Sequence, residues 1–425
     1  MMTKTATRDA PSDRDERDRF VWQVPTRVTF GRGTRHELGI ETAARGSSPA
    51  VVIDAGISSD SRVTDMVRSL TVHNVPATSL TFVDTNPTLR TVVEASLAIA
   101  EAGSDTVIAI GGGSTMDSAK LAALMVTNPH LRDPQLWESR ALLDLDEHRA
   151  VDLRPGLPTL MVPTTAATGS ELNSVAALSH GERRRLLVSG RLAPTSAVLD
   201  PELLMTVLTT ALLEGGVETL VRLISPYLAD SAALDVTDAL TLSLASQCLQ
   251  DLETISLTEE AASPVLAELM WTVGMSATQL FGVGRGRWSH VLWYLQDAVC
   301  SLLTIPKGQA IAALLPAYLG EIRADTELGR RMGSPERLAQ VETALAPILT
   351  PEPGLSLEEA LARRFADWGL SHNLSQLVTS ASDLDGFARH CYDGWHDEGR
   401  LQGVDLEELT DFFQRAGTGV VPPSR

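Results

Sequence analysis

Two stretches of glycine and hydroxyl residues follow apolar segments, at positions where they could bind a phosphate group. Residues 111–114 (GGGS) come directly after the apolar segment 106–110, and residues 163–171 (PTTAATGSE) follow the apolar segment 159–162. Glycine lets backbone N–H groups approach a pyrophosphate, and a helix that begins there adds partial positive charge. Glycine turns after strands are also common without a ligand, and this one does not match the Rossmann pattern G-x-G-x-x-G. The first turn on its own therefore leaves a purely structural role open.

The apolar segments that carry these turns are short, and segments with helical spacing separate them. The pattern predicts helices at 61–70, 89–102 and 114–125, and strands at 50–54, 79–83, 106–110 and 159–162. Strands that alternate with helices of this length form βαβ units and a mainly parallel sheet, which binds ligands at the carboxyl ends of its strands. We therefore expect an α/β dinucleotide-binding domain that brings the two turns to one edge of the sheet.

The composition of the segments changes after Asp200-Pro201. Long segments rich in leucine and alanine follow, with helical periodicity, at 206–228, 231–255 and 264–280. A break at 282–288 (GVGRGRW) separates helices, and 334–359 has the pattern of a helix pair with loops. We predict a disordered, polar tail at 1–18, an NAD-binding α/β domain at 19–200 and an all-α domain at 201–425, with a cleft between the two domains.

The composition excludes several classes of function. A length of 425 residues favours two domains, and a formal net charge of −19 would repel nucleic acids and anionic membranes. The three cysteines, Cys248, Cys300 and Cys391, lie far apart, which argues against a disulfide framework and a thiolate zinc site. No apolar run approaches about 18 residues, and the N-terminus lacks the apolar stretch of a signal peptide. We therefore predict a cytoplasmic protein with no nucleic-acid or membrane partner.

A third short motif completes a set that is typical of one family. Asn86-Pro87-Thr88 follows the strand predicted at 79–83, and the first turn extends to GGGSTMDSAK. Together with PTTAATGSE, and in this order, these motifs resemble those of the iron-containing alcohol dehydrogenases and the related dehydroquinate-synthase-like proteins. The resemblance covers roughly Val24 to Leu319, and it implies the fold expected above with a nicotinamide dinucleotide as cofactor.

The resemblance also implies roles for residues of the nucleotide site. The glycines and Ser114 would cradle the pyrophosphate, and the threonines of the second turn would flank the phosphates or the nicotinamide. Asp54, at the end of a strand, would bind the ribose 2′-hydroxyl and repel a 2′-phosphate, which favours NAD over NADP. An ordinary turn residue is the alternative for Asp54, and Arg184 stands where relatives usually place a lysine that contacts the cofactor. The predicted cofactor-binding residues are Asp54, Asn86, Gly111, Gly112, Ser114, Asp117, Thr164, Thr165, Thr168 and Arg184.

The same resemblance implies a metal site, and here the residues depart from the family. Relatives hold a divalent metal with an aspartate, a histidine four residues later and two further histidines, and the metal polarises the alcohol oxygen. The family segment GMDALxH matches GVETLVR, so Glu218 and Arg222 replace the first two ligands. The two further histidines fall on Trp293 and Lys307, and another family histidine near the substrate falls on Asp297. Because one ligand of four survives and two positions carry cations, we predict no catalytic metal.

The charges that replace the metal ligands allow two interpretations. Glu218 and Arg222 stand at i,i+4 spacing, and Lys307 could join them, so the charges could simply fill the cavity and neutralise one another. Alternatively, Lys307 or Arg222 stabilises a developing alkoxide, while Asp297 or Glu218 accepts its proton. Arginine could also hold a carboxylate of the substrate. The candidate catalytic residues are therefore Lys307, Glu218, Arg222 and Asp297.

Two functions follow from these interpretations. The first is a metal-independent, NAD-dependent oxidoreductase that oxidises a secondary alcohol of a small molecule or a peptide. The second is a catalytically degenerate scaffold subunit that binds NAD and stabilises or activates a partner oxidoreductase. A sugar-phosphate cyclase is disfavoured, because those enzymes also need the metal and the sequence shows no basic phosphate-binding set.

A looser resemblance, to the alcohol-dehydrogenase-like proteins of daptide-type peptide biosynthesis, implies a particular substrate. Together with a partner oxidoreductase, the protein would oxidise the C-terminal threonine of a ribosomal peptide to a β-keto acid, which loses carbon dioxide. Because related folds commonly pair through an edge strand, we expect a homodimer or a hetero-oligomer. The stretch 354–425 departs from the family, and its Trp368, Trp395 and His396 either line a cleft or serve as packing and surface residues.

Overall fold

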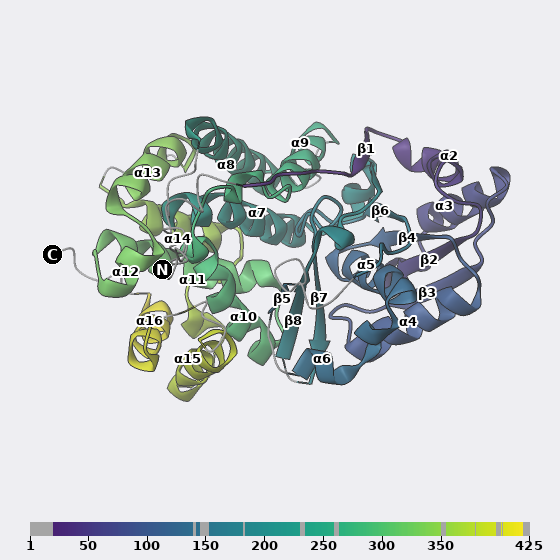
Figure 1. Cartoon of the computed structure of the whole chain (residues 1–425). Coiled ribbons are helices and arrows are strands. Elements are labelled where there is room, and N and C mark those ends of the chain that lie inside the picture. The colour runs from purple at the N-terminus through teal and green to yellow at the C-terminus, as the bar shows by residue number, and fades with distance from the viewer. Residues whose placement is uncertain are drawn as a thin grey trace, which may run out of the picture.

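The computed structural model describes residues 20–138, 142–144, 153–181, 183–229, 234–258, 263–349, 354–378, 380–396, 401 and 403–419. The tail predicted at 1–18 lies outside this part of the chain. Figure 1 shows two halves side by side, a sheet covered by helices and a bundle of helices. The predicted fold class, a mainly parallel α/β part followed by a helical part, is confirmed.

Six parallel strands form the central sheet, in the order β1-β9-β6-β4-β2-β3. Their bounds are β1 (Arg27–Phe30), β2 (Pro49–Asp54), β3 (Ser79–Val83), β4 (Thr106–Gly111), β6 (Thr159–Pro163) and β9 (Ser196–Leu199). The four predicted strands agree with β2, β3, β4 and β6 within one residue, because β2, β4 and β6 are continuous apolar runs buried on both faces. The pattern misses β1 and β9, since each has only four residues.

Helices cover both faces of this sheet. One face packs against α2 (Leu38–Ala43) and α3 (Ser61–Val72), and the other against α4 (Leu89–Glu101) and α5 (Gly113–Thr127). The chain passes from β2 outward to β3 and then back across to β4, so the topology switches between β2 and β4. Open α/β sheets bind ligands in the crevice at the carboxyl ends of such strands. The predicted GGGS turn follows β4 at that crevice.

A second, three-stranded sheet was not predicted from the sequence. It contains β5 (Leu142–Asp144), β7 (Val175–His180) and β8 (Arg183–Val188), with β7 and β8 antiparallel, and α6 (Pro134–Glu138) precedes it. The run of three arginines that opens β8 hides its strand pattern. Figure 1 places this sheet between the central sheet and the helical half, so its side chains can reach the boundary between the two.

The helical half is built around α7 (Thr209–Ala229), most of whose residues are buried. The predicted helix 206–228 begins too early, because Pro201–Thr206 forms a 3-10 turn before it. The pair predicted at 334–359 corresponds to α13 and the start of α14. The other helices are α8 (Asp235–Ser256), α9 (Ser263–Ser276), α10 (Val291–Leu303), α11 (Lys307–Arg323), α12 (Glu327–Met332), α13 (Pro335–Leu349), α14 (Leu357–Asp367), α15 (Ala381–Trp395) and α16 (Leu406–Thr418).

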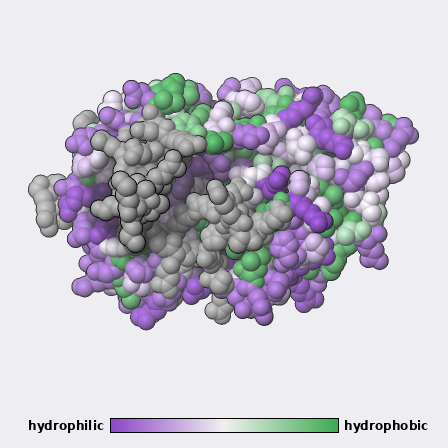
Figure 2. All heavy atoms as spheres, in the orientation of Figure 1, coloured by the Kyte–Doolittle hydropathy of each residue, from purple (hydrophilic) through white to green (hydrophobic). Residues whose placement is uncertain are grey.

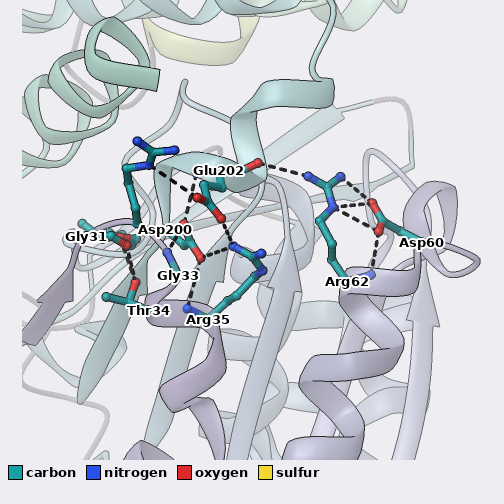
Figure 3. A network of polar contacts seen from close by, with 10 residues as sticks. Gly31, Gly33, Thr34, Arg35, Asp60, Arg62, Asp200 and Glu202 are labelled. Atoms are coloured by element: carbon teal, nitrogen blue, oxygen red, sulfur yellow. Dashed lines mark hydrogen bonds and ion pairs between the residues drawn. The ribbon is translucent and has the colours of Figure 1, made fainter. Parts of the chain in front are cut away.

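Asp200, at the predicted boundary between the halves, ties the start of the helical half to the loop after β1. Its buried carboxylate accepts hydrogen bonds from the backbone N–H groups of Gly33 (3.0 Å) and Arg35 (3.2 Å) and from the Arg35 guanidinium (2.7 Å), as Figure 3 shows. It also accepts the backbone N–H of Glu202 (3.1 Å) and so caps the 3-10 turn. A single satisfied carboxylate therefore fixes this boundary.

The described helices include none that is long and apolar enough to span a membrane. Hydrophilic residues cover most of the face seen in Figure 2, and hydrophobic residues form only small separate groups there.

Candidate active site

The GGGS turn lies at the switch point and leaves the start of α5 open. Gly111 has φ 159°, and a Cβ at this position would lie 2.5 Å from Thr115 Oγ1 and 2.8 Å from Asp54 Cβ, so only glycine fits. Gly112 is the N-cap of α5, and no side chain caps this end of the helix. The first-turn N–H groups and the positive end of the helix dipole therefore fit a pyrophosphate.

The second turn packs directly against the first. The backbone N–H of Thr164 donates to the carbonyl of Gly111 (3.1 Å). A Cβ on Gly113 would lie 2.5 Å from both Oγ1 and Cγ2 of Thr168, and Thr165 is exposed beside them. The structure thus brings the predicted glycines and threonines together in one cradle.

Asp117 and Lys120, one turn apart on α5, hold the second turn in place. Asp117 accepts hydrogen bonds from Ser170 Oγ (2.6 Å) and from the backbone N–H of Ala177 (3.0 Å), so both of its oxygens are engaged within the protein. Burial lowers the pKa of Lys120 to about 8. Its ammonium donates to four oxygens, namely Ser170 O, Asn173 O, Asn173 Oδ1 and Val175 O. These two residues of the GGGSTMDSAK motif therefore support the cradle from behind.

Two other predicted cofactor residues lie at the same edge of the sheet. Asp54 ends β2, and its carboxylate accepts the backbone N–H of Gly56 (2.9 Å), which caps a 3-10 turn at Ala55–Ile57. One of its oxygens thus serves as a turn cap, as the alternative interpretation expected. Asn86 has a left-handed φ of 58°, and its N–H donates to Ser114 Oγ (3.3 Å). Asn86 therefore orients the serine of the cradle.

In the helical half, Arg222 of α7 is engaged by three protein acceptors. It donates to Glu218 Oε1 (3.0 Å), to the backbone carbonyl of Ala167 (2.9 Å) and to Ser276 Oγ (3.0 Å). Its guanidinium also lies 5.8 Å from the ring of Trp293. Arg222 thus links the second nucleotide turn to α7 and α9, which favours a structural bridge over direct contact with a substrate.

Lys307, the first residue of α11, differs from Arg222 in having hydrogen-bond donors that no protein acceptor in the described ranges occupies. Its ammonium lies 3.9 Å from Glu218 Oε1, and it makes no hydrogen bond with any side chain or carbonyl in the described ranges. The side chain is 23% exposed. Burial and the nearby Arg184 lower the pKa of Lys307, while Glu218 and Asp117 oppose this shift. An ammonium in this setting can bind an oxygen that carries negative charge.

Asp297 of α10 supplies a carboxylate to the same cluster. Only 8% of this residue is exposed, and burial raises the pKa of its carboxyl to about 6. The positive charges of Arg184 and Lys307 act in the opposite direction. The resemblance placed Arg184 at the cofactor. In the structure Arg184 lies on strand β8, and its charge acts on Asp297 and Lys307.

The residues that the resemblance places at the metal-ligand positions do not fit a metal ion. Glu218 is the one carboxylate among them, and it is paired with Arg222 and Lys307. Trp293, at a third ligand position, is half-buried against the Arg222 guanidinium. Within the residues that the structure describes, no group of three or more His, Cys, Asp and Glu side chains is arranged to hold a metal ion. Two cations and an indole offer no donor set for a divalent metal.

Several residues of the site carried no signal in the sequence. Ser276 Oγ and the backbone carbonyl of Ala167 accept hydrogen bonds from Arg222. Lys120 was visible in its motif, and its offset of three residues from Asp117 could have indicated that the two act together.

Comparison with known proteins gives concordant sequence matches. The family model for iron-containing alcohol dehydrogenase matches residues 25–201. The probable alcohol dehydrogenase EutG of Salmonella typhimurium is 30% identical over 332 residues, which cover 76% of this chain and 77% of that protein. NADH-dependent butanol dehydrogenase B of Clostridium acetobutylicum is 26% identical over 304 residues, which cover 71% of this chain and 74% of that protein.

Solved structures share the same fold across almost the whole chain. NADH-dependent butanol dehydrogenase A from Thermotoga maritima superposes with a TM-score of 0.76 at 21% identity, covering 94% of this chain and 98% of its own. YqhD of Escherichia coli superposes with a TM-score of 0.78 at 20% identity, with the same coverage of both chains. Both halves of the chain therefore have counterparts in the fold of these structures.

Proposed function

This chain belongs to the iron-containing alcohol dehydrogenase family, and from this premise we propose that it is an NAD-dependent oxidoreductase that oxidises a secondary alcohol without a catalytic metal. The observation that carries the proposal is the state of Lys307, a partly buried ammonium at a metal-ligand position with donors to spare. A metal-free active site needs another positive charge beside the alcohol oxygen, and Lys307 is placed to supply it.

The nucleotide side of the site supports a dinucleotide cofactor. The open start of α5, with Gly111 and Gly112, would hold the pyrophosphate, and Asp54 would face the adenosine ribose at the end of β2. The negative charge of Asp54 favours NAD, because it would repel the 2′-phosphate of NADP. When bound, NAD⁺ accepts a hydride from the carbon that bears the hydroxyl group.

On the alcohol side, we assign two roles: Lys307 would stabilise the negative charge on the alcohol oxygen, and Asp297 would accept its proton. The Lys307 ammonium would hold the hydroxyl oxygen and stabilise its developing negative charge. Asp297, whose pKa of about 6 leaves it mostly ionised at neutral pH, would accept the hydroxyl proton. Activity should therefore fall below about pH 6, and also at high pH, where Lys307 loses its proton at a pKa below the ordinary 10.5.

For the substrate, we propose the C-terminal threonine of a ribosomal peptide, as the daptide resemblance implies. Its side chain is a secondary alcohol, and oxidation yields a β-keto acid that loses carbon dioxide. The half-buried Arg184 beside Asp297 would suit the terminal carboxylate, since a guanidinium can hold a carboxylate through two hydrogen bonds. A partner oxidoreductase would present the peptide.

Steady-state kinetics of Lys307 variants test this function, with NAD⁺ and a panel of secondary alcohols that includes peptides ending in threonine. Lys307→Met keeps the length of the side chain and removes the charge, and it should lower kcat by roughly 10²- to 10³-fold, as loss of an oxyanion donor does. Lys307→Arg should restore part of the rate. Unchanged turnover in Lys307→Met would refute the role of the cation.

A catalytically degenerate scaffold subunit is the second candidate, and the Arg222 contacts favour it. The buried Glu218 and the partly exposed Arg222 neutralise each other, and Arg222 bridges the two halves, as in a site that has become structural. A scaffold would bind NAD, show no turnover with any alcohol of the panel, and raise the stability or activity of a co-purified oxidoreductase. Turnover by the isolated chain would exclude it.

A further inference from the structure

The middle of the second nucleotide turn contacts α7 through two backbone carbonyls. Gly215 lies so close to the carbonyl of Ala166 that a Cβ would overlap its oxygen. Two turns further along α7, Arg222 Nη2 donates to the carbonyl of Ala167 (2.9 Å). The two carbonyls lie between the threonines that pack on the GGGS turn, so α7 holds the part of the second turn that closes the cradle.

The position of the Arg222 guanidinium is itself fixed by α7 and α9. Nη2, which reaches Ala167, also donates to Glu218 Oε1 (3.0 Å), one turn earlier on α7. Nη1 donates to Ser276 Oγ (3.0 Å), and that hydroxyl donates in turn to the carbonyl of Val273 (2.7 Å). Glu218 and Ser276 are only 4% and 3% exposed, so water has little access to replace them. The planar fork of an arginine suits three acceptors in fixed directions, whereas the single nitrogen of a lysine does not.

We propose that Arg222 is a positioning residue for the cofactor, which keeps the second turn in its binding conformation through the carbonyl of Ala167. This inference rests on the proposed function for the identity of the cofactor, NAD. The position at which the resemblance places a metal ligand then acts on the dinucleotide instead of on the alcohol. Without the contact the turn samples other conformations, and the apparent affinity falls with the fraction of molecules that keep the binding conformation.

The first experiment is a calorimetric titration of Arg222→Lys with NAD⁺. The variant keeps a positive charge beside Glu218 and loses the fork that reaches Ala167. The dissociation constant for NAD⁺ should rise roughly tenfold, the weight of one charge-assisted hydrogen bond. In steady-state kinetics the loss should be larger in kcat/KM for NAD⁺ than in kcat, because saturating cofactor selects the binding conformation.

Arg285→Lys is the matched control for the loss of a guanidinium. The Arg285 side chain is buried, and it donates to the carbonyls of Phe281 (2.6 Å) and Pro226 (3.2 Å) and to the Asp238 carboxylate (2.7 Å). These three acceptors lie in the helical half, away from the nucleotide turns. Arg285→Lys should therefore lower the melting temperature and leave the affinity for NAD⁺ unchanged.

A pair of glycine variants tests the same contact if Arg222→Lys fails to fold. In Gly215→Ala the new methyl group pushes against the carbonyl of Ala166, so NAD⁺ binding should weaken as it does in Arg222→Lys. In Gly216→Ala the methyl group overlaps the Leu252 side chain on α8, so stability should fall without a change in NAD⁺ affinity. Unchanged NAD⁺ affinity in both Gly215→Ala and Arg222→Lys, with lower melting temperatures, would mean that α7 only packs on the turn, and it would overturn the proposal.

Hydrogen exchange of the full chain separates this inference from the proposed function. In Arg222→Lys the amides of residues 163–171 should exchange faster than in the parent, while those of α16 keep the parent rates. Parent rates at 163–171 would refute the role of Arg222, even if the enzyme is active. A parent protein that binds NAD⁺ and oxidises no alcohol, with the variant weakened as predicted, would refute the proposed function and leave the role of Arg222 standing. A parent protein that binds no NAD⁺ would refute both.

Discussion

On the nucleotide side, the site consists of two turns whose glycines and threonines pack backbone against backbone, each turn directly after a strand of one sheet. On the alcohol side, α7, α10, α11 and β8 each contribute one or two charged side chains from distant parts of the chain. The first arrangement needs particular backbone conformations, which short motifs preserve. The second needs particular side chains at points where several helices meet, and such a site can exchange a metal for charged residues while the fold persists.

Removal of the Asp297 carboxylate, on the alcohol side, should have the largest effect on catalysis. Asp297→Asn should lower kcat by roughly 10²- to 10⁴-fold, the contribution of a positioned proton acceptor, and leave the affinity for NAD unchanged. Steady-state kinetics and nucleotide titration measure the two effects separately. A matching loss of NAD affinity would mean that the two sides of the cleft are not independent.

The stability of the same variant provides a control for its folding. Burial raises the pKa of Asp297 to about 6. The buried charge therefore lowers the free energy of unfolding at a pH above about 6, and this cost disappears at a low pH where the carboxyl is protonated in both the folded and the unfolded state. Asp297→Asn should therefore have a higher melting temperature than the parent protein at pH 8 and lose that advantage near pH 4. A lower melting temperature at both pH values would show that the carboxylate is needed for packing.

Addition of one methyl group at Gly113, on the nucleotide side, should have a smaller effect, limited to the affinity for the cofactor. In Gly113→Ala the new Cβ would lie 2.5 Å from Thr168 and displace the second turn, which should weaken NAD binding roughly ten- to hundredfold. Gly386→Ala on α15 is the matched control, because a Cβ there meets nothing within 4 Å. Calorimetric titration with NAD distinguishes the two variants, and equal affinities would argue against the cradle.

The smallest expected change concerns the choice of cofactor. Asp54→Ser keeps an oxygen that can cap the turn through Gly56, and it removes the negative charge that would face the 2′-phosphate. The ratio of NADP to NAD affinity should rise by about tenfold, or about 1.4 kcal/mol. An unchanged ratio would leave Asp54 with the role of a turn cap alone.

The same contrast explains what could be predicted from the sequence. Four strands of the central sheet and the cradle at 111–114 were predictable, because apolar runs and a glycine motif are local signals. Strands β1, β9 and β8 were missed, because they are short or begin with arginines. The contact of Trp395 with Tyr294 could not be predicted, since only the packing of α15 on α10 brings them together.

The roles of individual charged residues could not be predicted from the sequence either. The sequence offered Arg222 and Lys307 as equivalent cations for the alcohol oxygen. Their difference lies in hydrogen bonds to Ala167 and Ser276, which occupy Arg222 and depend on the tertiary structure of the second turn and of α9. The charge of Arg184 lies near Asp297 because β8 runs alongside α10, an arrangement that no motif encodes.

The measurement that bears most directly on a metal-free active site is turnover by protein from which metals have been stripped. Elemental analysis and nucleotide extraction on one sample would accompany assays of NADH formation before and after exhaustive chelation. We predict that NAD binds, that metal is far below one equivalent, and that chelation leaves the rate unchanged. Loss of turnover on chelation, with recovery on addition of ferrous iron or zinc, would contradict a catalytic role for Lys307 in place of the metal.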